Sequence, residues 1–131
     1  MNQEIKAKWI AWLRDPAHKQ ATGSLRKEDS FCCLGGLCEV YKDETGRGEW
    51  HPFHPTCHPH PHKYSFFGGV GALPEVVAEW AGLESNDPLV YVAEFVGRPF
   101  ALSSLNDGFK YEGEAKRLTF PEIADIIEKE L

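Results

Sequence analysis

The apolar run FCCLGGLCEVY, residues 31–41, limits more than any other feature what this chain can fold into. Glu39 is the only charged residue of the run, so a helix built from it would be apolar almost all round. Such a helix is stable only when other elements cover every side of it, so the run predicts a buried central helix. Gly35 and Gly36 each cost about 1 kcal/mol against alanine in a helix, so we expect another backbone to approach closely there.

Further elements are expected on both sides of this helix. Periodic apolar residues predict helices over residues 3–14, 74–81 and 120–130, and β-rich runs predict strands over residues 63–67 and 88–92, the latter extended by or paired with residues 94–97. Asp29 or Ser30 would cap the central helix, and Asn106-Asp107-Gly108 would form a turn. The predicted fold is α+β: a small single domain, residues 1–131, with about four helices packed around a short antiparallel sheet and a long His/Pro-rich loop.

Residues 43–63 break this pattern. They contain four prolines and five of the six histidines and hardly any aliphatic side chain. A segment of this composition is typical of a long surface loop, so we expect a variable His/Pro-rich arm at about 43–63. As a proline-rich segment, the arm is also a candidate recognition strip of a protein-interaction module.

The arm carries candidate metal ligands. In an extended conformation His58, His60 and His62 would alternate onto one face, and Cys57 is the nearest further ligand. Imidazole and thiolate groups suit zinc, either as a structural staple or as a hydrolytic centre with an open coordination position. The paired spacings of recognised zinc sites are absent, so adventitious metal binding and a metal-free exposed loop remain open alternatives.

Charge and apolar pattern exclude several classes of protein. The net charge of −6 and the pI of about 5.5 argue against nucleic acid as the main partner. No apolar stretch is long enough to span a membrane and no secretory signal is evident, so a cytoplasmic protein is expected. Cys32, Cys33 and Cys38 point in different directions on a helix, and we interpret them as buried, reduced thiols.

The remaining polar candidates favour ligand binding over catalysis. The sequence contains no GxxxxGK[ST], GxGxxG, GxSxG or HExxH motif, so an enzyme is the less favoured class, although catalytic carboxylates would leave no signature. Arginines suit phosphate, an amide and a carboxylate on a turn suit ribose or base edges, and aromatic rings suit stacking. The candidate ligand-binding residues are Arg26, Arg98, Asn106, Asp107, Trp50 and Tyr64.

The core motifs resemble a known family. The run FCCLGGLC at residues 31–38 and Leu105-Asn-Asp107 are similar to a family of small proteins of unknown function from tailed bacteriophages and prophages. The resemblance covers residues 9–41 and 102–128, and the His/Pro-rich arm departs from it. It implies a phage-type accessory protein of the host cytoplasm with no catalytic residues. Small phage proteins often counter host antiviral defence, some by sequestering nucleotide signals, so the expected partner is a small anionic ligand or a host protein, bound by a homo-oligomer or a single chain.

Overall fold

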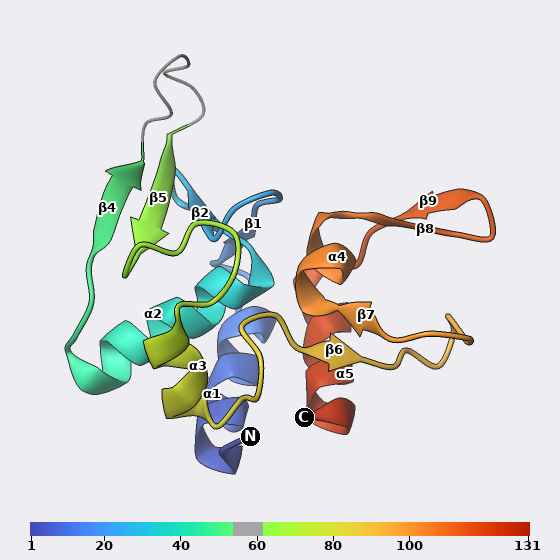
Figure 1. Ribbon diagram of the computed structural model, residues 1–131, viewed down its shortest axis with the longest axis horizontal. Coiled ribbons are helices and arrows are strands. Elements are labelled where there is room, and N and C mark those ends of the chain that lie inside the picture. Colours follow the sequence, from blue (N-terminus) through green and yellow to red (C-terminus); the bar gives the residue numbers. More distant parts are fainter. Residues whose placement is uncertain (54–61) are drawn as a thin grey trace.

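The computed structural model of the protein describes residues 1–53 and 62–131 and confirms an α+β fold. Its helices are α1 (Gln3–Arg14), α2 (Cys33–Thr45), α3 (Glu75–Ala81), α4 (Leu102–Asp107) and α5 (Phe120–Glu130) (Figure 1). Strands β1 (Lys19–Gln20), β2 (Arg26–Lys27), β3 (Ser30–Phe31), β4 (Trp50–Phe53) and β5 (Lys63–Phe66) form one sheet in the order β1-β3-β2-β5-β4. The remaining strands form two pairs, β6 (Leu89–Val90) with β7 (Phe100–Ala101) and β8 (Phe109–Tyr111) with β9 (Glu114–Lys116).

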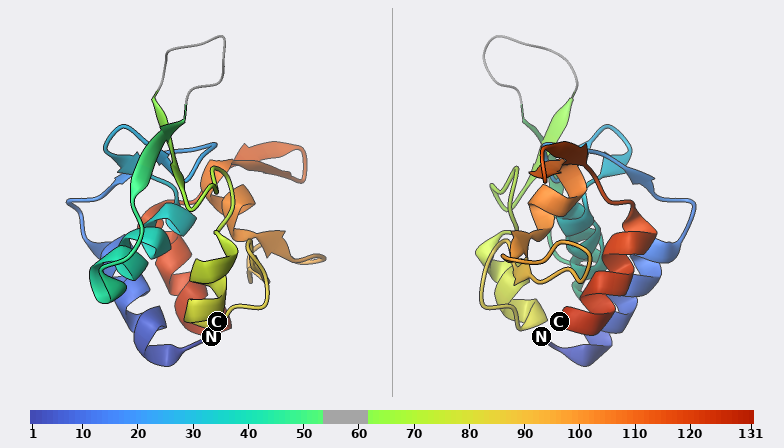
Figure 2. Two further views of the ribbon diagram at one scale, coloured as in Figure 1. Left: turned by 60° about the vertical axis from the view of Figure 1, so that its left-hand side comes forward. Right: turned by 90° about the vertical axis from the view of Figure 1, so that its right-hand side faces the viewer.

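Helix α2 is the buried centre of the molecule, as predicted from its apolar run. Figure 2 shows α1 and α5 lying side by side, and α1 also packs against α2. A Cβ atom at Gly35 would overlap the carbonyl of Leu25, which confirms the expected close backbone. A Cβ atom at Gly36 would instead meet the indole ring of Trp12, so the second glycine makes room for a side chain. Both glycines are therefore required by packing.

The helix ends are only partly as predicted. The expectation that Asp29 or Ser30 caps α2 is wrong, because strand β3 continues to Phe31 and the helix begins at Cys33. The N-cap is Cys32, whose Sγ accepts a hydrogen bond from the backbone N–H of Gly35 at 3.3 Å. The other helices predicted at residues 3–14, 74–81 and 120–130 are present with ends within one residue.

Two further segments differ from prediction. The region around residues 106–108 is not an isolated turn but the end of the short helix α4, whose Leu102 and Leu105 are buried. The partner of β6 is β7, residues 100–101, and not residues 94–97. Both elements are too short for hydrophobic periodicity to define them, because the helix of six residues has only two buried apolar positions, Leu102 and Leu105, and the strand of two residues has one.

Part of the segment expected as an arm is regular structure, and residues 54–61 of it lie outside the described residues. Helix α2 continues to Thr45, and β4 pairs antiparallel with β5, with His51 opposite Ser65 and Phe53 opposite Lys63. Pro52 is tolerated within β4 because this strand lies at the edge of the sheet, where a missing N–H donor disrupts no ladder. In the part of the chain that the structure describes, no helix combines the length and apolar character needed to cross a membrane.

Candidate ligand-binding site

Three of the six predicted ligand-binding residues come together on the five-stranded sheet. Arg26 on β2 lies directly opposite Tyr64 on β5, and Trp50 lies on the neighbouring strand β4 (Figure 1). The guanidinium carbon of Arg26 is 4.4 Å from the centroid of the Tyr64 ring, 5.7 Å from that of Trp50 and 5.4 Å from that of Phe31. Cation–π attraction therefore holds the arginine among three rings.

Arg26 keeps part of its binding capacity toward solvent. Its Nε donates a hydrogen bond to the carbonyl of Glu28 at 2.6 Å, and its Nη2 is 3.6 Å from Oδ1 of Asp29. The Arg26 side chain is 21% exposed, whereas the Asp29 side chain is 98% exposed. An ion pair with so exposed a carboxylate contributes little free energy, so a bound phosphate or carboxylate can take the place of Asp29.

Trp50 forms a fixed wall of this site. Its indole Nε1 donates a hydrogen bond to Oε2 of Glu39 at 3.0 Å. Its ring lies 4.8 Å from the ring of the fully buried Phe66 and 5.7 Å from that of Phe31. With its only donor satisfied and its ring packed against the core, the indole can offer a ligand an apolar face and nothing else.

The opposite face of the same sheet is basic. Lys19, Lys27 and Lys63 occupy one register row across β1, β2 and β5, with Ser30 between the first two. Register partners project to the same face of a sheet, so the three lysines share a face. Among the described residues none of the three forms an ion pair. Sequence analysis missed this row, because strands of two residues carry no detectable alternation.

Arg98 lies apart from this sheet. It is exposed, and its guanidinium carbon is 4.2 Å from the centroid of the Phe100 ring on β7. It therefore lies in the segment just before β7, beside the two-stranded β6–β7 sheet, and is not brought together with Arg26 on the five-stranded sheet.

Asn106 is fully buried and its amide is saturated with hydrogen bonds. Its Oδ1 accepts from Nε2 of Gln20 at 2.9 Å and from the backbone N–H of Cys33 at 3.1 Å. Its Nδ2 donates to the carbonyl of Ala21 and to Oδ1 of Asp107, both at 2.8 Å. An asparagine amide can make four such bonds, so in this conformation Asn106 has none left for a ligand. Asp107 is exposed at the end of α4.

Most of the predicted metal ligands lie outside the described residues. These are Cys57, His58 and His60, so the zinc site stays a prediction. His62 is described: its backbone N–H donates to Oε1 of Glu28 at 3.3 Å, and its carbonyl accepts from the Glu28 N–H at 3.0 Å. Within residues 1–53 and 62–131, no three His, Cys, Asp or Glu side chains are placed to hold a metal ion.

The α2 thiols, Cys32, Cys33 and Cys38, are buried and free, as predicted. Burial raises the pKa of Cys32 to about 12, and it raises the pKa of Cys33 and of Cys38 well above the ordinary value. The thiolate is the nucleophile and the metal ligand, so at neutral pH these protonated thiols serve neither purpose. They act as small apolar side chains of the core.

Comparison with known proteins identifies a family. The model of a family described as "Domain of unknown function (DUF8296)" matches residues 1–131. No curated protein and no solved structure shows significant similarity to the chain.

Proposed function

This chain belongs to the DUF8296 family, and since the description of that family names no activity, we propose a function from the residues themselves. The protein is a binding protein that captures a small anionic ligand of the nucleotide type on its five-stranded sheet. Sequestration of this kind needs tight binding and no chemical step, which agrees with a sequence that contains none of the common phosphate-loop or hydrolase motifs.

The position of Arg26 carries this proposal. A guanidinium group binds phosphate through two parallel hydrogen bonds, and aromatic rings beside it provide a surface for a base. Arg26 is already fixed by the rings of Tyr64 and Trp50 and by its bond to Glu28. A side chain that is ordered before binding loses less conformational entropy when the ligand arrives, which favours tight binding.

The basic face of the sheet supports the same class of ligand. The protein has a net charge of −6, yet Lys19, Lys27 and Lys63 concentrate positive charge on one register row. Lys27 and Lys63 lie directly opposite each other, an arrangement that destabilises a sheet when both residues are charged. These lysines lie on the face opposite Arg26, so their charge would attract an anion to the sheet at long range without contacting a ligand held by Arg26.

The resemblance of residues 31–38 to small tailed-phage proteins extends the proposal to biology. It suggests that the ligand is a cyclic nucleotide or an ADP-ribose-derived signal of host antiviral defence, and that the protein inhibits this defence by withholding the signal.

Isothermal titration calorimetry with cyclic di-adenosine monophosphate and ADP-ribose tests the proposal, with inorganic phosphate as a control. Arg26→Gln should weaken binding by about 10- to 150-fold, the loss expected when a charge-assisted hydrogen bond of about 1.5–3 kcal/mol is removed. Arg98→Gln is the matched control, because it removes the same charge at a site remote from the five-stranded sheet, and binding should change less than twofold. Equal effects of the two substitutions, or no binding of either nucleotide, would refute the proposal.

A further inference from the structure

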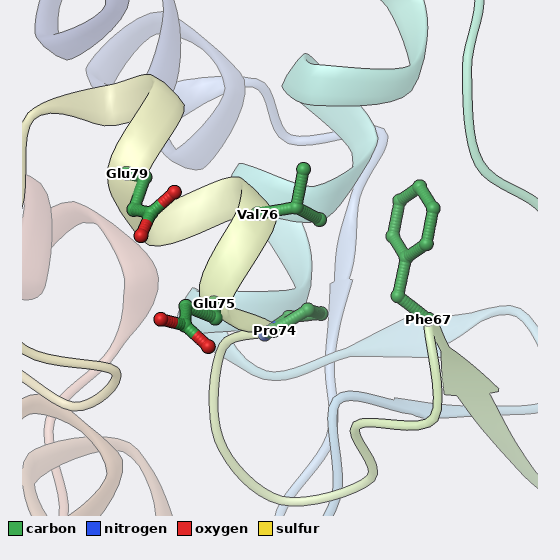
Figure 3. A pocket seen from close by; sticks show the side chains of 5 residues that line it. All are labelled: Phe67, Pro74, Glu75, Val76 and Glu79. Carbon is green, nitrogen blue, oxygen red and sulfur yellow. The ribbon is translucent and has the colours of Figure 1, made fainter.

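A second surface lies where β5 ends and α3 begins. An open hollow of about 440 Å³, called here the α3 hollow, is lined by Phe67, Pro74, Glu75, Val76 and Glu79. Figure 3 shows the ring of Phe67 standing across from Val76 and Pro74, with the two glutamates on successive turns of α3. Phe67 is 49% exposed and Val76 is 40% exposed, so apolar side chains on both sides of the hollow remain in contact with water.

The turn that presents Phe67 is conformationally unfavourable. Phe66 and Gly69 exchange two backbone hydrogen bonds of 2.9 Å, and the two residues between them have positive φ angles, 48° at Phe67 and 80° at Gly68. Two positive φ angles are typical of a type I′ hairpin turn, whose first central position favours Asn, Asp or Gly. A bulky aromatic residue in this conformation is an outlier, and such outliers occur most often at functional sites.

The Phe67 ring is held in place without being covered. It lies edge-on to the ring of Phe66 at 5.0 Å and to that of Tyr41 at 5.8 Å. These contacts fix its orientation from the core side and leave about half of the side chain in solvent. The turn therefore combines a strained backbone with an exposed apolar ring. An asparagine at position 67 would fit the backbone without strain but would expose no apolar ring.

The charge at the hollow is negative and unpaired. Glu75 and Glu79 lie four residues apart on one face of α3, a spacing at which like charges repel. Glu79 also lies in the last turn, where a negative charge opposes the helix dipole and no basic residue of α3 offsets it. Within the described residues neither carboxylate forms an ion pair. A cationic partner would relieve all of these repulsions.

From these observations we propose that the α3 hollow docks a short basic and apolar peptide segment of a partner protein. An apolar side chain of the segment enters between Phe67 and Val76, and a Lys or Arg beside it pairs with Glu79 and Glu75. The apolar contact supplies most of the affinity, and the carboxylates select a basic sequence and reject an acidic one. This surface is separate from the Arg26 site and does not depend on the function proposed for it.

Nuclear magnetic resonance titration tests the proposal with two synthetic peptides. The probe is acetyl-Lys-Arg-Leu-Phe-Lys-Arg-amide, and its control carries glutamate at the four basic positions. The probe should shift backbone amide signals of residues 67–69 and 75–79, and the acidic peptide should shift none of them. Shifts located elsewhere, or equal binding of the two peptides, would overturn the proposal.

Substitutions then separate the apolar contribution to peptide binding from the electrostatic one. Phe67→Asn suits the positive φ and should keep the fold, shown by an unchanged circular dichroism spectrum, yet it should weaken probe binding by about tenfold or more. Val76→Ser tests the opposite wall independently of the turn, with a loss in the same direction. Glu75→Gln with Glu79→Gln should weaken binding about fivefold and reduce its dependence on salt.

Two controls separate this proposal from its alternatives. Arg26→Gln should leave binding of the probe peptide unchanged, because Arg26 is not part of the α3 hollow. A failure of peptide binding at the hollow therefore does not count against ligand binding at Arg26, and the reverse also holds. Sedimentation of the free protein tests the other occupant, a second copy of the chain. Self-association that Phe67→Asn abolishes would identify the hollow as a dimer interface and overturn docking of a basic peptide.

Discussion

Replacing Asn106 by leucine should cost the protein a large part of its stability. Leucine has the same branching at Cγ as asparagine, although its side chain is larger, and the substitution removes four hydrogen bonds, two of which involve buried backbone groups: the N–H of Cys33 and the carbonyl of Ala21. The N–H of Cys33 is one of the first N–H groups of α2, which have no partner within the helix. Asn106 on α4 therefore stabilises the start of the central helix from outside.

The magnitude follows from these two groups. A buried backbone donor or acceptor left without a partner costs about 1–3 kcal/mol, so the pair predicts a loss of about 4 kcal/mol. The other two partners lose less, because Gln20 keeps its bond to the carbonyl of Leu118 and Asp107 is exposed to water. A chain of 131 residues has a free energy of unfolding of about 7–20 kcal/mol, so Asn106→Leu removes a substantial fraction of it.

Urea unfolding followed by tryptophan fluorescence measures this loss. The control is Lys110→Ala, which removes an exposed side chain without an ion pair among the described residues and should change the free energy of unfolding by less than about 0.5 kcal/mol. A loss below about 1 kcal/mol for Asn106→Leu would refute the reasoning. It would mean that the start of α2 finds other partners, and Asn106 would return to consideration as a ligand-binding residue.

Two further predictions concern α2. Gly35→Ala places a Cβ atom against the carbonyl of Leu25 and should destabilise the protein by about 1–3 kcal/mol in urea unfolding, whereas Gly71→Ala, in open space, should leave stability equal or higher. Burial raises the pKa of the α2 thiols, so above about pH 9 the unfolded state releases protons that the folded state still holds. The contribution of the thiols to stability is therefore fully present below this pH and is lost as the pH rises above it. With three such thiols, the free energy of unfolding should be about 4 kcal/mol lower at pH 10 than at pH 8. Replacing Cys38 by alanine removes one of them, so the urea midpoint should fall less steeply with pH. An unchanged pH dependence would contradict burial of the thiols as the cause.

Sequence patterns predicted the long elements of this fold because their signals are redundant. The helix at residues 120–130 has an apolar stripe and also a capping box, in which Thr119 and Glu122 bond each other's backbone N–H. Helix α2 carries both an apolar run and the glycines at which Leu25 and Trp12 approach. Each of these predictions was supported by more than one physical requirement, and the structure confirmed them together.

The five-stranded sheet could not be predicted in the same way. Three of its strands contain two residues, and the neighbours in space include β2 with β5, which are separated by about 35 residues in the chain. The pairing of Arg26 with Tyr64, and the row of lysines on the other face, follow from register, which no local pattern specifies at this length. That the predicted arginine and rings meet on one sheet is consequently information that only the structure supplies.

Residue chemistry alone also does not separate binding groups from packing groups in this chain. Asn106 and the α2 thiols carry the types of atoms that bind ligands and metals, and the core has used all of them: the amide in four hydrogen bonds, the thiols in apolar burial. Arg26 and Phe67 are the opposite case, because each is held from the core side while part of it faces solvent. A side chain that is fixed but incompletely covered can bind a partner without reorganising the core. On this criterion substitutions of Arg26 or Phe67 can change what the two proposed surfaces bind and leave the hydrogen bonds of Asn106 and the burial of the α2 thiols intact.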